Sequence, residues 1–98
     1  CDKLPDRFNT YENAIKTVKS SSFKIKETVV TSKSTWIKGA SYYSCDGNTG
    51  YFILETKKQD YIYSAMPIEI WTGFKSAESF GSYYNSFIKQ RYQLILSD

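Results

Sequence analysis

Histidine is absent from this chain of 98 residues, which also has only two cysteines, two prolines and one methionine. Without imidazole, the chain lacks the most common general base and the usual ligand of first-row metals. Cys1 and Cys45 are too far apart for a C-x-x-C motif, and the acidic residues are scattered singly, without the spacing of a calcium loop. We therefore expect a non-catalytic protein that needs neither a metal nor another cofactor.

Long apolar runs are also missing, because no run approaches the roughly 20 residues that span a bilayer. The length suits a single domain. The net charge of +3 is unevenly distributed: residues 1–35 contain seven basic and four acidic residues, whereas residues 36–98 contain six of each. This balance in the larger part of the chain argues against a strong phosphate-binding face and disfavours nucleic acid as a partner.

The chain begins with Cys1, Asp2 and Lys3, followed by a short polar stretch. This pattern resembles the start of a mature bacterial lipoprotein, in which the N-terminal thiol carries the lipid. We therefore expect lipidation of Cys1, with residues 1–8 as a tether that reaches about 25 Å at about 3.3 Å per residue. The alternatives are a Cys1–Cys45 disulfide in a secreted protein and an arbitrary boundary of the sequence.

One helix and four strands are predicted in the first two-thirds of the chain. Asn9, followed three residues later by Glu12, resembles a capping box and starts a helix that ends near Lys19. Alternating or aromatic-rich patterns predict four strands: 23–29, 36–44, 51–56 and 61–65. Gly39 predicts a bulge in the second strand, and residues 46–50 form a turn signal. We expect the last three strands to form an antiparallel meander.

Two further helices are predicted after the strands. Pro67 suits the first turn of the first helix, whose apolar stripe is Ile70, Trp71, Phe74 and Ala77. Ser79 is the expected N-cap of the second, whose stripe is Phe80, Tyr84, Phe87, Ile88 and Tyr92. The predicted fold class is therefore α+β, a single domain over residues 9–98. It has an N-terminal helix, a four-stranded mostly antiparallel sheet and two C-terminal helices packed on the sheet.

The stretch from Tyr61 to Tyr92 has an unusual arrangement of aromatics, proline and glycine: Y-I-Y-S-A-M-P-x-x-x-W-x-x-F-x-x-A-x-S-F-G-S-Y-Y-N-x-F-I-K-x-x-Y. It resembles the KTSC domain, a small module named after its occurrence at the C-terminus of lysyl-tRNA synthetases. The resemblance extends back through residues 34–37 and so covers about residues 34–92. It implies a fold and brings no biochemical activity with it.

The candidate binding residues lie within this family-like region: Tyr63, Trp71, Ser79, Gly81, Tyr84, Asn85 and Lys89. Tyrosines on adjacent strands suit an aromatic platform, although core packing is the favoured interpretation. Free amides near Ser79 and Gly81 suit an anion, but a cap and a close helix approach explain these two residues more simply. Asn85 and Lys89 match the family pattern and form the best candidate for a polar functional pair. The equally weighted alternative is local hydrogen bonding by Asn85 and coverage of apolar surface by Lys89.

The expected function is that of a small interaction module in the bacterial cell envelope. Lipidated Cys1 would anchor it to a membrane outside the cytoplasm, in the periplasm or on the cell surface. There it would bind a protein partner, for instance in an inhibitor or immunity role. The alternative is an accessory RNA-binding module, as the attachment of the family to a tRNA synthetase suggests. A third hypothesis, a reactive Cys45, requires an exposed thiol of lowered pKa. The oligomeric state is not predicted.

Overall fold

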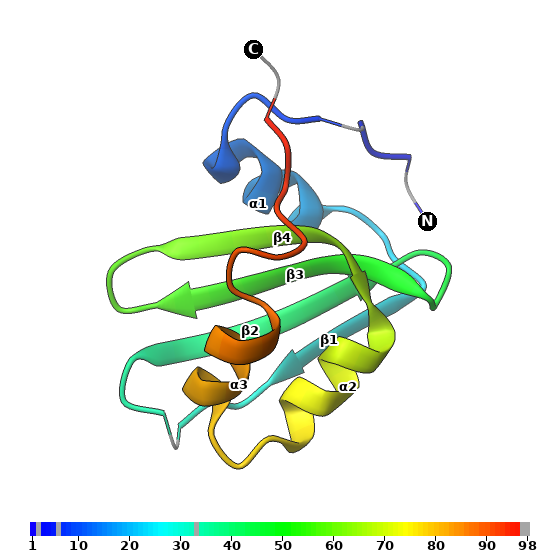
Figure 1. Ribbon diagram of the computed structural model, residues 1–98. Coiled ribbons are helices and arrows are strands. Elements are labelled where there is room, and N and C mark those ends of the chain that lie inside the picture. Colours follow the sequence, from blue (N-terminus) through cyan, green and yellow to red (C-terminus); the bar gives the residue numbers. More distant parts are fainter. Residues whose placement is uncertain (2, 6, 33, 97–98) are drawn as a thin grey trace.

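The computed structural model describes residues 1, 3–5, 7–32 and 34–96. Their fold is α+β, as predicted, and Figure 1 shows the seven elements. In chain order these are α1 (Tyr11–Ser20), β1 (Ile25–Val29), β2 (Ile37–Ser44), β3 (Thr49–Thr56), β4 (Asp60–Pro67), α2 (Ile68–Ser76) and α3 (Phe80–Phe87).

The four strands form one antiparallel sheet in the order β1-β2-β3-β4, so β1 and β4 are its two edges. The predicted meander is confirmed. The register shifts in β2 between Ile37 and Gly39, where the sequence predicts a bulge. Helices α2 and α3 cover one face of the sheet, and α1 lies against the other face beside β4 (Figure 1).

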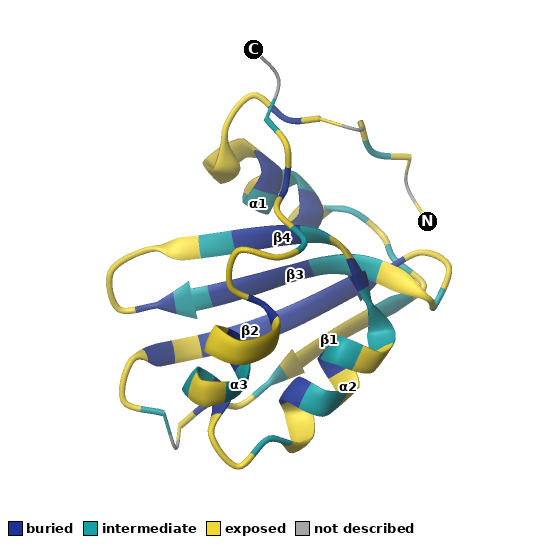
Figure 2. Cartoon of the chain, in the orientation of Figure 1, coloured by how far each residue is buried: buried dark blue, intermediate teal, exposed yellow. Residues whose placement is uncertain are grey.

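The central strand β3 is apolar on both sides because successive side chains of a strand point to opposite faces. Phe52 and Leu54 belong to the core under α2 and α3, whereas Ile53 belongs to the core under α1. All three are buried, and Figure 2 shows buried positions running along the middle of the sheet. The sheet therefore has to be covered on both faces.

Trp71 of α2 packs against several aromatic rings in the larger core. Its ring stacks on Tyr42 with a centroid distance of 5.5 Å and on Phe74 with 5.9 Å. Its indole Nε1 donates a hydrogen bond of 2.7 Å to Oε1 of Glu27, which also accepts one of 2.9 Å from Nζ of Lys75. These two bonds lower the pKa of Glu27 and join α2 to the edge strand β1.

The smaller core contains residues from both ends of the chain. Ala14 and Val18 of α1 pack there with Phe8 and Leu94, and Phe8 is only 3% exposed. Phe8 also forms a parallel bridge with Leu96. The segment 1–8 was expected to be a tether. Its end is anchored, because Phe8 is buried in the smaller core and Leu4 packs partly against it, whereas residues 1, 3, 5 and 7 are exposed.

A disulfide between Cys1 and Cys45 provides a second attachment of this segment. It corresponds to the secreted-protein alternative considered for Cys1, whereas lipidation was the favoured expectation. The two states exclude one another, because a sulfur atom in a disulfide cannot also form a thioether to a lipid. In this structure Cys45 therefore has no free thiol.

The helix boundaries differ from the predicted ones at each helix. Pro67 and Ala77 cap α2 from outside, although they were expected in its first turn and its apolar stripe. Thr10, not Asn9, caps α1, since its hydroxyl accepts a hydrogen bond of 3.0 Å from the backbone N–H of Asn13.

Helix α3 ends at Phe87, before the predicted stripe is complete. Within that stripe Phe87 is half-exposed, whereas Ile88, directly after the helix, is buried. Positive φ angles at Gln90 and Tyr92 then direct the chain into an extended tail.

Removal of the disulfide is expected to lower the free energy of unfolding by about 3 kcal/mol, because the bond closes a long loop in the unfolded chain. The two cysteines are 44 positions apart. Urea unfolding of Cys45→Ser, Cys1→Ser and reduced wild-type protein should give the same loss, since each lacks only this bond. Equal stability of the oxidised and reduced proteins would contradict the prediction.

Candidate binding groove

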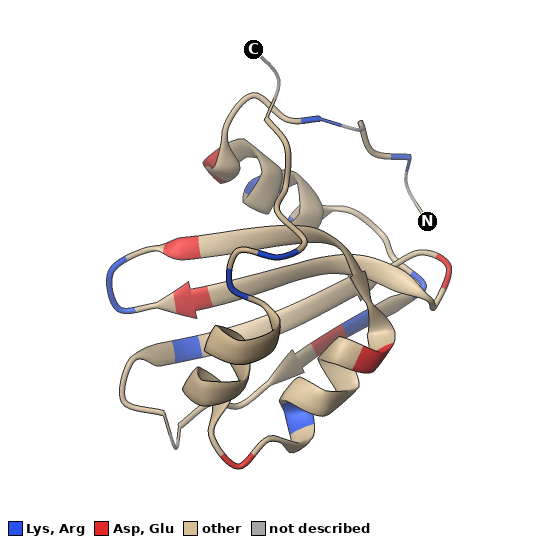
Figure 3. Cartoon of the chain, in the orientation of Figure 1, with Lys and Arg blue, Asp and Glu red and all other residues tan. Residues whose placement is uncertain are grey.

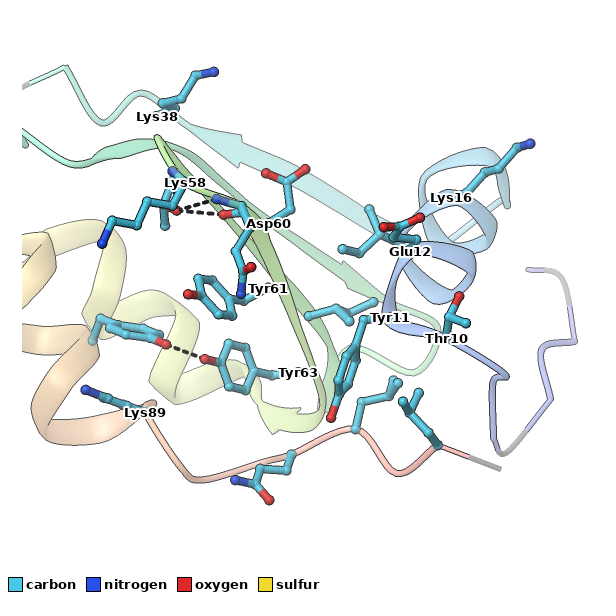
Figure 4. Close-up of a pocket in the computed structure, with 18 of the residues that line it drawn as sticks. Thr10, Tyr11, Glu12, Lys16, Lys38, Lys58, Asp60, Tyr61, Tyr63 and Lys89 are labelled. Atoms are coloured by element: carbon cyan, nitrogen blue, oxygen red, sulfur yellow. Dashed lines mark hydrogen bonds between the residues drawn. The ribbon is translucent and has the colours of Figure 1, made fainter. Parts of the chain in front are cut away.

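An open groove of about 1260 Å³ lies beside the edge strand β4. The start of α1 lines one side of it, and the turn between β3 and β4 lines the end nearest Asp60. The segment after α3 and the C-terminal tail complete the opposite side (Figure 4). The groove thus joins residues from both ends of the chain to the same edge strand.

Tyrosines from three elements line this groove. Tyr61 and Tyr63 are two residues apart in β4, so their rings point to the same face of the sheet, toward α3 (Figure 4). Tyr84 comes from α3, and Tyr11 comes from the first turn of α1 on the other side of β4. Tyr11 is 49% exposed, whereas Tyr63 and Tyr84 are almost completely buried. The groove therefore has a buried aromatic floor and an exposed aromatic rim.

The hydroxyl groups of Tyr63 and Tyr84 form a hydrogen bond with each other. Burial raises the pKa of both residues, and the bond to Tyr84 raises that of Tyr63 further. A tyrosine hydroxyl is neutral at physiological pH even at its ordinary pKa, and these shifts keep both hydroxyls neutral at still higher pH. The floor of the groove adds no negative charge to the cations around it.

Lysines outnumber acidic residues around the groove. The basic residues are Lys16, Lys38, Lys57, Lys58 and Lys89, and the acidic residues are Glu12 and Asp60. Basic positions mark the turn between β3 and β4 and the segment after α3 (Figure 3). Four of the six basic residues in 36–98 line the groove, but only one of the six acidic residues there does so. The neutral balance of this part of the sequence therefore conceals a local positive field.

Three of the predicted binding residues meet in this groove: Tyr63, Tyr84 and Lys89. Asn85 is exposed on α3 but does not line the groove, so the structure does not bring it together with Lys89 there. Lys89 follows the last turn of α3 and does not belong to the helix. Because α3 ends before Lys89, the two residues do not form the predicted pair on one helical face.

The other predicted binding residues have structural positions outside the groove. Trp71 has 0% exposure in the larger core. Ser79 caps α3 as predicted, because its Oγ accepts a hydrogen bond of 3.2 Å from the N–H of Ser82. Gly81 faces Trp36, and a Cβ atom at this position would lie 2.8 Å from the Nε1 atom of the indole. The close packing at Gly81 thus involves Trp36.

The sequence analysis missed Tyr11, Tyr61, Lys38 and Lys58 as members of one site. Adjacent lysines in a turn directly before an aromatic strand were the available signal for Lys58 and Tyr61. Nothing in the sequence pattern connects Tyr11 with that strand, because the contact depends on how α1 docks. Among the described residues, no group of three or more Cys, Asp and Glu side chains is placed to hold a metal ion.

Comparison with known families bears on the second half of this fold. Residues 56–92 match the KTSC domain. The match confirms the resemblance, over a shorter range than the expected residues 34–92. The matched segment runs from the end of β3 to Tyr92 and contains Tyr61, Tyr63, Tyr84 and Lys89 of the groove. The α1 side of the groove lies outside the KTSC match. Searches of curated proteins and of solved structures found no match to the chain.

Tyr63→Phe and Tyr84→Phe are each expected to lower the free energy of unfolding by about 1–3 kcal/mol, because each leaves a buried hydroxyl unpaired. The double variant should lose less than the sum of the two single losses, since it removes both hydroxyls together. Chemical denaturation of the three variants measures this coupling. Tyr11→Phe, at an exposed position, is the control and should change stability by less than about 0.5 kcal/mol. Strict additivity at Tyr63 and Tyr84 would show that their bond contributes nothing.

Proposed function

We propose that this protein is a non-catalytic binding module whose groove at the edge of β4 binds a protein partner. The observation that carries the proposal is the convergence of tyrosines and lysines from α1, β4 and the segment after α3 on one open groove. Tyrosine offers a large contact area and a polar hydroxyl at low cost in side-chain entropy, which is why it is enriched in binding surfaces. The surrounding lysines favour encounter with an acidic partner.

The disulfide supports an extracytoplasmic location, because such bonds persist mainly in secreted proteins and in oxidising compartments. In a bacterial envelope, a small module of this kind suits an inhibitor or immunity role against another envelope protein. A lipid on Cys1 would place the same module at a membrane surface, at the expense of the disulfide. None of the helices in the described part of the chain is long and apolar enough to cross a membrane.

The state of Cys1 can be read from the intact mass of the protein expressed from its own full-length gene. We expect a species two hydrogens lighter than the reduced chain, which gains both hydrogens on treatment with a thiol reductant. Analysis of membrane and soluble fractions should be made in parallel. A membrane-bound species with a diacylglyceryl adduct on Cys1 would replace the disulfide with the lipid anchor, whereas a reduced cytosolic species would contradict an extracytoplasmic location.

Site-specific photocrosslinking tests the groove itself. Benzoylphenylalanine in place of Tyr61 should yield a protein adduct in cells of the source organism, and the adduct should resist nuclease. The matched control is benzoylphenylalanine in place of Lys24, an exposed position directly before β1 at the opposite edge of the sheet. The adduct should be absent from the control and reduced by an additional Lys89→Glu change. Equal adducts at both positions would remove the groove as the binding surface.

RNA binding is the second candidate, and the clustering of lysines with exposed Tyr11 is the observation that favours it. Proteins that bind single strands combine a basic groove with aromatic side chains on which bases stack. The disulfide counts against it, because RNA partners are found mainly in the reducing cytosol. A nuclease-sensitive adduct at position 61 would support this alternative over a protein partner.

A further inference from the structure

We propose that the partner presents an acidic segment with an aromatic side chain next to it, and that Trp36 is the anchor for this side chain beside the groove. The inference rests on the proposed function and specifies the chemistry of the partner of that same site. Lysines near the turn between β3 and β4 receive the acidic residues, while Trp36 contacts the aromatic one. Trp36 does not line the groove itself, so the binding surface extends beyond the groove.

The first step of the argument is the uneven charge along the groove. The side formed by α1 contains Glu12 and Lys16, whose charges cancel. The remaining charged residues of the groove are four lysines and one aspartate: Lys38, Lys57, Lys58, Lys89 and Asp60. Figure 4 shows Lys38, Lys58 and Lys89 on the side of the groove away from α1. An acidic segment is therefore attracted to this side, which we call the basic end.

The second step is that the lysines of the basic end have no carboxylate partner. The ion pairs among the described residues join Lys19 to Glu55 and Lys75 to Glu27, and all four of these residues lie outside the groove. Within the described part of the chain, no lysine that lines the groove belongs to an ion pair. The basic end can therefore bind carboxylates of a partner without breaking an ion pair of its own.

The third step is the position of Trp36 beside the basic end. Its ring contacts that of Tyr84, which lines the groove, with a centroid distance of 5.9 Å. Its carbonyl accepts a hydrogen bond of 3.2 Å from the backbone N–H of Lys57, a residue of the basic end. Trp36 is 37% exposed, whereas Trp71 is completely buried. The indole of Trp36 thus adds exposed aromatic surface next to unpaired lysines, and tryptophan is enriched among the residues that dominate binding energy.

The fourth step is that this indole is held in place before a partner arrives. Gly81 of α3 lies against the ring, where a Cβ atom would come within 2.8 Å of Nε1. Tyr84, on which Trp36 packs, is itself fixed by the hydrogen bond between its hydroxyl and that of Tyr63. A side chain that is already ordered loses little conformational entropy when a partner binds. These contacts therefore fix Trp36 without burying it.

The anchor is tested with two labelled synthetic peptides, each a run of about six glutamates that ends in phenylalanine or in alanine. Fluorescence anisotropy with the oxidised full chain should show that the phenylalanine peptide binds at least about fivefold more tightly. In Trp36→Ala this difference should fall below about twofold, because the contact with the anchor is gone. Trp36→Phe keeps an aromatic ring and should keep most of the difference. Val30→Ala, at a more exposed apolar position, is the control and should leave it unchanged.

The basic end is tested with Lys58→Glu combined with Lys89→Glu. This variant should bind both peptides at least about tenfold more weakly, with the loss diminishing as salt rises from about 50 mM to about 500 mM. Lys24→Glu combined with Lys26→Glu gives the same change of net charge at the opposite edge of the sheet and should leave affinity within about twofold.

Acrylamide quenching of tryptophan fluorescence gives a readout on the wild-type protein, which does not depend on the folding of any variant. Since Trp36 is exposed and Trp71 is buried, acrylamide acts mainly on Trp36. A saturating amount of the phenylalanine peptide should reduce this quenching, and the alanine peptide should reduce it less. Circular dichroism identifies any variant that fails to fold.

The outcomes separate this inference from the proposed function. Equal affinity of the wild-type protein for the two peptides, failure of the phenylalanine peptide to bind, or unchanged quenching would overturn the anchor at Trp36. The proposed function would survive such a result if position 61 still gave a nuclease-resistant protein adduct. Tighter binding of an eight-nucleotide uridine oligomer than of the phenylalanine peptide would overturn both and favour the RNA alternative.

Discussion

Burial of β3 on both faces is the constraint on which the rest of the structure depends. Phe52, Ile53 and Leu54 are consecutive and are all almost completely buried, so neither face of the sheet can be left in water. Helices α2 and α3 cover the face of Phe52, and α1 covers the face of Ile53 together with both ends of the chain. The two coverings meet at β4, the edge strand between α1 and the tail, and the groove lies at that meeting place.

The groove therefore depends on where α3 ends and on how the chain after it returns to β4. Helix α3 stops at Phe87, and the backbone reverses through Gln90 and Tyr92 with positive φ angles. This reversal brings the tail to β4, where Gln93 bridges to Tyr63 and Leu94 packs in the same core cluster as Ile62. Had α3 continued through Tyr92, as the apolar spacing suggested, the tail could not pair with β4 in this manner. The departure from the predicted helix is thus what shapes the site.

Local patterns were sufficient to predict the elements, because they depend on neighbouring residues. Alternation gave the strands, Gly39 gave the bulge, and Ser79 gave the cap of α3. Local patterns were insufficient for the site, which depends on tertiary docking. Trp71 and Tyr84 have equally favourable positions in the sequence and both pack in the larger core, yet only Tyr84 also lines the groove. The net charge of residues 36–98 was similarly uninformative, because summation over a sequence discards the positions of charges in space.

The boundary of the KTSC match divides the groove into two parts. The matched residues 56–92 supply the strand edge, the buried tyrosine pair and Lys89, whereas Tyr11 and Lys16 come from α1 outside the match. If the groove binds a partner, the KTSC residues would contact it through the tyrosine floor and Lys89. Because Tyr11 and Lys16 belong to α1, the selectivity of such binding would also depend on residues that the KTSC match does not include.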